Sequence, residues 1–199
     1  MRRSHLYFDV QFCDHKNSFY HSFVRSYMLI THYCPNKEYL FKKITEYSPK
    51  DIKKILVKLC NYDGTAYERF RNFEEYYPQR LATESWLYSA AKKKGIIPEV
   101  HSPWYFILGE STILSSGFGP HAFVYQMDLN DISNKHISFT LGDSMGVFLL
   151  NEEHRCVYNM EEIINMHQNN GLSRVETFNY LQEKHKYIEA QIWTSQYFK

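Results

Sequence analysis

One carboxylate near the C-terminus, Glu189, has the sequence surroundings of a functional acid. It lies in residues 186–193, which read KYIEAQIW and alternate between two kinds of side chain. This period of two predicts a half-buried β-strand. One face of the strand would carry Ile188, Ala190 and Ile192, and the other Tyr187, Glu189, Gln191 and Trp193.

Glu189 is the single acidic residue of this predicted strand, and this limits the reactions that it could catalyse. A fixed carboxylate between aromatic rings can bind a ribose hydroxyl and stabilise positive charge that develops at an anomeric carbon. Retaining glycosidases need two carboxylates at a defined separation, whereas this strand supplies only Glu189, so a lone acid acting on a ribosyl bond fits better. The structural alternative is a glutamate paired with Lys or Arg across the sheet, which would contribute little to stability.

A second segment, residues 136–145, could bring polar groups to the same place. It reads HISFTLGDSM, in which Ser138 and Thr140 share one face of a predicted strand. The following Gly142-Asp143-Ser144 predicts a tight turn whose side chains and amides could hold hydroxyl or phosphate groups. A plain hairpin turn explains the same three residues.

A third segment, residues 101–111, predicts a strand that runs into a loop at Gly109. Gly109 permits close backbone approach, and Tyr105 or Trp104 could stack on a flat ring. Core packing explains Trp104 equally well.

These segments resemble a known family. Residues 187–193 are similar to the strand that carries the catalytic Glu in ADP-ribosyltransferase-fold proteins. Together with residues 105–109 and 137–144, they resemble small bacterial toxins of toxin–antitoxin and phage-defence systems that ADP-ribosylate nucleic acid. The resemblance covers about residues 78–193, and many family members carry Glu or Gln where this chain has Tyr187.

The resemblance implies NAD in a cleft between two sheets, with Glu189 as the catalytic acid and no metal. The implied NAD contacts come from Tyr105, Gly109, Ser138, Thr140, Asp143, Ser144 and Gln191. His5, His21 and the strand at residues 105–109 compete for the family's first motif, an Arg or His on an early strand. The acceptor would be a macromolecule, more readily an RNA or single-stranded DNA base than a protein, and an antitoxin protein could neutralise the activity.

Two other functions stay open at this stage. Arg25 and His32 have a spacing that a metal-independent ribonuclease toxin could use. A non-catalytic interaction protein could instead use the aromatic faces to bind a partner.

Composition adds broad limits. The 199 residues predict a single domain, with 17 Lys/Arg against 11 Asp/Glu in residues 1–100 and 6 against 11 in residues 101–199. The basic half could meet nucleic acid or the acidic half of its own fold. Four cysteines without CxxC spacing favour a reducing compartment and no zinc site. Without a recognisable signal peptide or apolar span, we expect a cytoplasmic protein with no membrane contact.

Local patterns predict the elements that position these residues. Helices are expected after Ser48-Pro49, over 65–77 and 78–94, from Asn159 to about Asn170, and over 174–184 after a capping box. Strands are expected at 5–12, 104–108, 122–129, 137–141, 147–150 and 156–158. The predicted fold is therefore α+β, with a helix-rich half over about 1–97 and a mainly antiparallel sheet over about 98–199.

Overall fold

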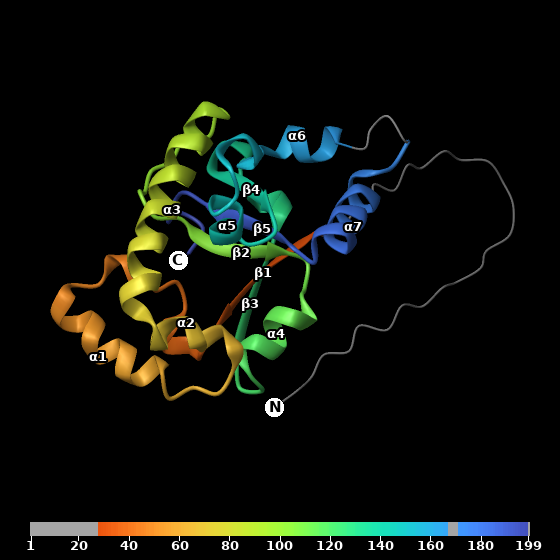
Figure 1. Cartoon of the computed structure of the whole chain (residues 1–199). Coiled ribbons are helices and arrows are strands. Elements are labelled where there is room, and N and C mark those ends of the chain that lie inside the picture. Colours follow the sequence, from red (N-terminus) through yellow and green to blue (C-terminus); the bar gives the residue numbers. More distant parts are fainter. Residues whose placement is uncertain (1–27, 167–170, 199) are drawn as a thin grey trace, which may run out of the picture.

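The computed structural model describes residues 28–166 and 171–198, and its strands form a five-stranded antiparallel sheet (Figure 1). The strands are β1 (Leu29–Cys34), β2 (Trp104–Leu108), β3 (Phe123–Asp128), β4 (Ile137–Leu141) and β5 (Ile188–Ile192). Their order is β3-β1-β2-β5-β4, so β5 is a central strand between β2 and β4. The strand predicted at residues 5–12, together with His5, His21 and Arg25, lies outside the described residues.

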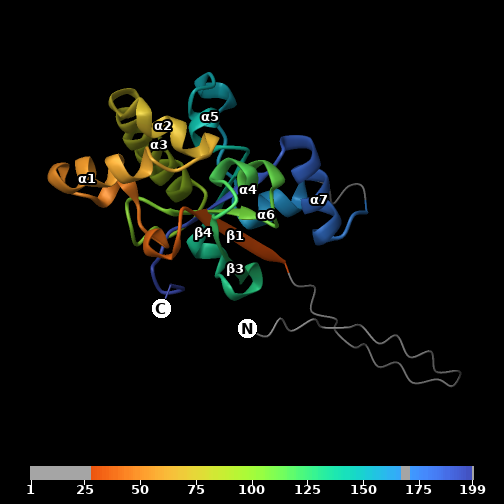
Figure 2. The same cartoon turned by 90° about the horizontal axis from the view of Figure 1, so that it is seen from below.

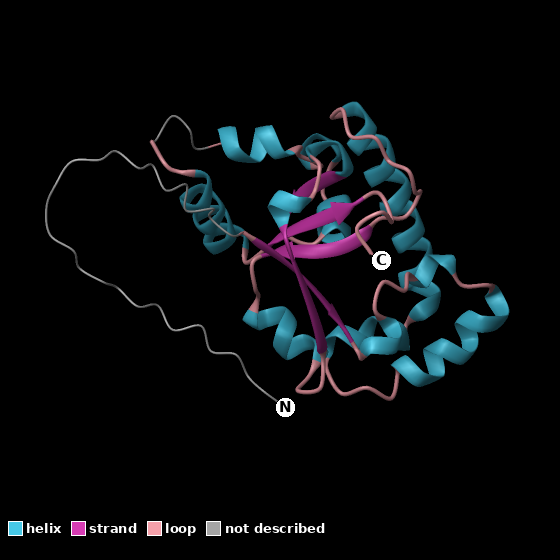
Figure 3. Cartoon of the chain, turned by 180° about the vertical axis from the view of Figure 1, so that it is seen from behind, coloured by secondary structure: helices cyan, strands magenta, loops and turns pink. Residues whose placement is uncertain are grey.

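Seven α-helices are described around this sheet. They are α1 (Pro49–Leu59), α2 (Glu68–Arg71), α3 (Phe73–Lys93), α4 (Thr112–Phe118), α5 (Ser144–Phe148), α6 (Met160–Asn165) and α7 (Arg174–His185). Figure 2 shows α1, α2, α3 and α5 gathered on one side of the sheet. The strands lie in the middle of the molecule with helices around them (Figure 3).

The helix starts follow from their caps. The Ser48 side chain accepts a hydrogen bond from the Asp51 amide at the start of α1, and the capping boxes of Asn159 and Ser173 are both formed. The expected break at Pro78 is wrong, because α3 begins at Phe73 and continues through this proline. Pro78 removes one backbone donor, and the helix around it tolerates that loss.

Of the strands predicted after residue 98 from short apolar runs, the three longer ones are confirmed and the two shorter ones are wrong. β2 and β4 have the predicted bounds, and β3 lies inside residues 122–129. The strand predicted at 147–150 is wrong, because the Asp143 side chain caps the short helix α5 there. Residues 156–158 contribute only an isolated bridge between Tyr158 and Phe139. β1 also brings the N-terminal half into the sheet, which the expected division into two halves did not include.

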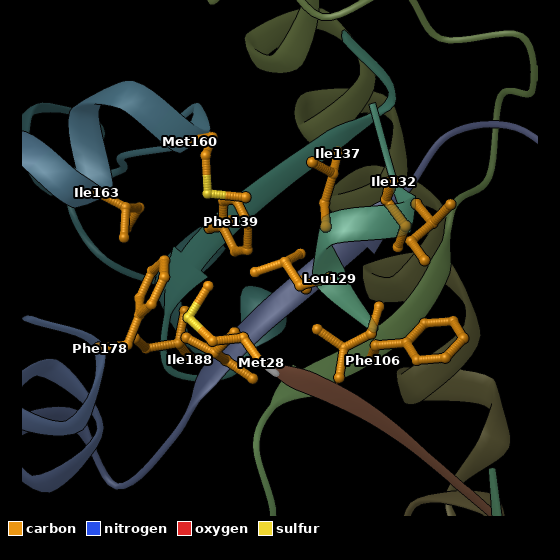
Figure 4. Packing of buried hydrophobic residues seen from close by; sticks show 14 of the residues in the cluster. Met28, Phe106, Leu129, Ile132, Ile137, Phe139, Met160, Ile163, Phe178 and Ile188 are labelled. Atoms are coloured by element: carbon orange, nitrogen blue, oxygen red, sulfur yellow. The ribbon is translucent and has the colours of Figure 1, made fainter. Parts of the chain in front are cut away.

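The hydrophobic core lies against one face of the sheet, called here the apolar face (Figure 4). Strand residues Phe106, Phe139 and Ile188 pack there against Phe178 of α7 and Ile163 of α6. The opposite face, called here the polar face, is covered by α3 and α5. β5 is therefore buried on both faces, and the predicted half-buried strand is wrong because helices also cover the face that carries Glu189 and Gln191.

Candidate functional site

The polar face carries aligned polar side chains from adjacent strands. In the register of the sheet, Glu189 lies opposite Thr140 of β4 and Ile107 of β2. Gln191 lies opposite Ser138 and Tyr105 in the same way. Because side chains two residues apart on a strand share a face, these groups point together toward the helical layer.

A cavity of about 350 Å³ lies above this face, and Glu189 lines it. The sheet contributes Thr31, His32, Tyr33, Tyr105, Phe106, Ile107 and Glu189 to its walls. The helices contribute Arg69, Arg80, Leu114 and Phe118, and neighbouring loops contribute Thr65, Asp143 and Tyr187. Volumes of about 300–1,000 Å³ are typical of small-molecule sites.

Glu189 is a buried acid that one hydrogen bond holds in place. Its side chain is 7% exposed, and its Oε1 accepts a hydrogen bond from Gln191 Nε2 at 3.1 Å. Burial, together with the negative charge of Asp143, raises the pKa of Glu189 to about 7. The positive charge of Arg80 and the Gln191 hydrogen bond oppose this rise. Glu189 therefore changes charge near neutral pH.

Gln191 is the centre of a buried hydrogen-bond network. Its Nε2 also donates to Thr140 Oγ1 at 3.0 Å, and its Oε1 accepts from Ser138 Oγ at 2.9 Å. Trp193 Nε1 donates to Ser138 Oγ at 2.9 Å. The structure thus places Ser138, Thr140 and Gln191 behind Glu189, where they orient it, and none of the three is among the residues that line the cavity.

Arg80 brings a buried positive charge to the same cavity. Its Nε lies 3.0 Å from Glu84 Oε1, one helical turn along α3, and its guanidinium lies 3.8 Å from the centre of the Tyr105 ring. The Tyr105 hydroxyl donates to Glu84 Oε1 at 3.4 Å. Burial acts to lower the pKa of Arg80, but the surrounding acidic groups, Glu189 included, hold it above its usual range. Arg80 stays charged.

The sequence analysis missed Arg80, although a signal was present. Arg80 and Glu84 are four residues apart, on the same helical stripe as Leu87 and Ala91. All four residues are buried. Burying a charged pair on a helix costs desolvation free energy, so such a pair is a candidate for a functional site.

Asp143 approaches Glu189 from the loop between β4 and α5. Gly142 takes φ +93° and donates its backbone amide to the Tyr187 carbonyl at 3.0 Å, which holds this loop against β5. Asp143 lines the cavity and is exposed, and its Oδ1 accepts from the Met145 amide at 3.4 Å. Its charge raises the pKa of Tyr187, after burial, which is the larger cause.

Two other predicted contacts, Ser144 and Gly109, are not among the residues that line the cavity. The Ser144 hydroxyl is buried and makes no hydrogen bond of normal geometry, although it lies near enough to help lower the pKa of Glu189. Gly109 takes φ +66°, and its carbonyl accepts from Thr31 Oγ1 at 2.5 Å.

His32, the histidine of the ribonuclease hypothesis, belongs to β1. His32 lies near the rings of Phe41 and Phe106, with ring centres 6.0 and 5.3 Å away, and its Nδ1 lies 2.7 Å from the Tyr105 carbonyl oxygen. Burial lowers its pKa, so the ring is neutral at pH 7. His32 is partly buried and is among the residues that line the cavity, and Arg25 lies outside the described residues.

Searches for metal and membrane features were limited to the described residues. Within 28–166 and 171–198, no group of three or more His, Cys, Asp or Glu side chains is placed to hold a metal ion. No helix in this part of the chain is long and apolar enough to cross a membrane. Comparison with protein-family models, with curated proteins and with solved structures found no match for the chain.

Proposed function

We propose that this protein is an ADP-ribosyltransferase that binds NAD in the cavity and cleaves the bond between nicotinamide and ribose. One observation carries the proposal: a buried carboxylate on a central strand, Glu189, faces the same cavity as a buried guanidinium, Arg80. Ribosyl transfer develops positive charge at the anomeric carbon, which an ionised Glu189 would stabilise. The diphosphate of NAD is an anion that Arg80 would bind.

The cavity walls offer groups that could contact the ribose and the nicotinamide of NAD. Gln191 would keep the Glu189 carboxylate oriented toward the ribose, since one Glu189 oxygen is already bound by the amide. Tyr187 adds an aromatic ring to the cavity for the flat nicotinamide. Because 350 Å³ is at the low end for such sites, we expect the adenosine end to extend past the cavity mouth.

This arrangement differs from the cleft that the resemblance implied. The described strands form one sheet, so the proposed site lies between its polar face and the helical layer instead of between two sheets. The positive charge comes from Arg80 on helix α3, not from an early strand. The proposal therefore rests on the chemistry of the cavity and on the short sequence resemblance.

We propose a nucleic-acid acceptor because aromatic rings and arginines lie on the surface beside the cavity. Four partly buried rings occupy α2 and the start of α3; they are Phe70, Phe73, Tyr76 and Tyr77, called here the aromatic patch. The exposed Arg69 and Arg71 belong to α2, and Arg69 also lines the cavity. Aromatic rings beside arginines bind unstacked bases of single strands. A neutralising antitoxin and a cytoplasmic location follow from the resemblance and the composition, and both stay predictions.

The test is to incubate the purified protein with NAD and, separately, with RNA, single-stranded DNA and protein, and to search each acceptor by mass spectrometry for added ADP-ribose. We expect labelled nucleic acid and released nicotinamide with the wild type, and neither with Glu189→Gln. Glu183→Gln is a matched control, because Glu183 is exposed on α7 and is not among the residues that line the cavity. Nucleic-acid binding without any nicotinamide release would contradict the proposal and favour a non-catalytic interaction protein.

A further inference from the structure

Glu189 is not the only carboxylate at the cavity, and the two acids differ in exposure. Glu189 is buried at the base, whereas Asp143 is exposed in the cavity wall. The charge of Asp143 acts on both Glu189 and Tyr187, so it lies within electrostatic reach of the proposed reaction centre. An exposed acid in this position can meet a group that enters from solvent.

The position of Asp143 is fixed from both sides of the loop. Thr140 Oγ1 donates to the Gly142 carbonyl at 3.0 Å, and the Gly142 amide donates to the Tyr187 carbonyl at 3.0 Å. Downstream, Asp143 Oδ1 caps α5 through the Met145 amide. Its Oδ2 makes no hydrogen bond within the described part of the chain. One oxygen is therefore used for placement, and the other is available.

Transfer to an oxygen or nitrogen nucleophile needs a base. The other titratable residues that line the cavity are His32, Tyr33, Arg69, Arg80, Tyr105, Tyr187 and Glu189. Arginines cannot accept a proton at neutral pH. Burial raises the pKa of Tyr105 and of Tyr187, so both stay protonated. Glu189 interacts with the ribosyl group in the proposed reaction. The Tyr33 hydroxyl accepts a hydrogen bond from the Ser111 amide at 3.2 Å. The ring of His32 packs beside Phe106, with its Nδ1 2.7 Å from the Tyr105 carbonyl oxygen.

We propose that Asp143 is the general base that removes the proton of the acceptor nucleophile. The inference rests on the proposed function. The acceptor lone pair forms the new bond to the anomeric carbon as the bond to the nicotinamide nitrogen breaks. The bonding electrons leave with nicotinamide, and the acceptor proton passes to Asp143 Oδ2.

The experiment compares nucleophiles that do and do not carry a proton. Wild type and Asp143→Asn are given NAD with water, with methanol or with azide, and nicotinamide and the ribosyl products are measured. Asparagine keeps the cap of α5, since it is as good an N-cap as aspartate. We expect Asp143→Asn to lower turnover with water and methanol by about 100-fold or more. Azide has no proton to lose and should restore turnover to within about tenfold of wild type, with azido-ADP-ribose as the product.

Asp128→Asn is the matched control, because Asp128 Oδ1 also caps a short helix, accepting from the Asn130 amide at 2.8 Å, but lies outside the cavity. It should turn over like wild type with every nucleophile. Unchanged turnover of Asp143→Asn with methanol would overturn the inference. So would a loss that azide does not restore in a variant that still binds NAD and unfolds at the wild-type temperature. A wild type that releases no nicotinamide overturns the proposed function itself.

Discussion

The two faces of the sheet use the same strands for different purposes. On β5, Ile188, Ala190 and Ile192 enter the packed apolar core, while Glu189 and Gln191 enter a hydrogen-bonded network beside a cavity. The apolar face stabilises the fold by removing hydrocarbon from water. The polar face buries groups that cost stability unless they are paired. The proposed active site therefore lies on the polar face, where the fold buries polar groups at a cost in stability.

The cost at Glu189 depends on pH in a definite direction. Its pKa is about 7 in the fold against an ordinary 4.5, which corresponds to about 3 kcal/mol. Between these values the folded state binds more protons than the unfolded state, so stability falls as pH rises from about 4.5 to 7. Above pH 7 the ionised Glu189 destabilises the fold by the full amount, and below 4.5 by none.

The largest expected effect on the polar face is that of Arg80→Met. It leaves Glu84 buried and unpaired, so we expect a loss of about 3–5 kcal/mol in the free energy of unfolding. It should also lower nicotinamide release about 100-fold or more, because the cavity loses its buried cation. Urea unfolding and a release assay measure both.

A double variant separates the two consequences of losing Arg80. Arg80→Met with Glu84→Met removes the unpaired charge and should recover most of the stability without recovering activity. Recovery of activity along with stability would show that Arg80 has only a structural role.

On the apolar face, Phe139→Ala should lower stability by about 3–5 kcal/mol through the cavity it creates. Its nicotinamide release, measured well below the unfolding temperature, should stay within a few-fold of wild type. Ser138→Ala, at the adjacent residue, is the contrasting change on the polar face. It removes a hydrogen bond to Gln191 and should lower the free energy of unfolding by about 1–3 kcal/mol. A large loss of release in folded Phe139→Ala would contradict the division between the faces.

Gln191→Met tests the network with little change in volume. It leaves Ser138, Thr140 and Glu189 without their shared partner and should cost about 1–3 kcal/mol. The lost hydrogen bond favoured ionised Glu189, so the pKa of Glu189 should rise and the acidic limb of the pH–rate profile should move to higher pH. Gln182→Met, on α7 and outside the cavity, should leave the profile unchanged.

The smallest predicted effects concern how the rate of nicotinamide release depends on pH. Only ionised Glu189 stabilises the developing positive charge, so nicotinamide release should rise through an apparent pKa of about 7. Asp143→Asn removes a negative charge that raises this pKa, so its acidic limb should move to lower pH. A profile that stays flat down to pH 5 would contradict the assignment of Glu189.

Sequence patterns predicted single elements better than their assembly. Period-two alternation located β5, short apolar runs located β2 and β4, and cap residues located the starts of α1, α6 and α7, because all three signals are local. The partner of each strand is not a local property. The central position of β5, and its burial on both faces, could not be read from residues 186–193.

The sequence predicted the polar residues of β4 and β5 and of the loop after β4, but not the helical side of the candidate site. Glu189 was singled out by its place between aromatic residues, and Asp143 by the turn it occupies. Arg80 comes from a helix more than a hundred residues earlier in the chain, and only the tertiary fold brings it to Glu189. Ser138 and Thr140 were predicted to share a face, but their burial depends on α3 and α5.

The most direct test measures stability and nicotinamide release together in Glu189→Gln at pH 8. A catalytic carboxylate that is costly to bury should give an inactive variant whose free energy of unfolding exceeds that of wild type by up to about 3 kcal/mol, with the difference vanishing near pH 4.5. A variant that is less stable than wild type at pH 8, or that still releases nicotinamide at the wild-type rate, would contradict the account.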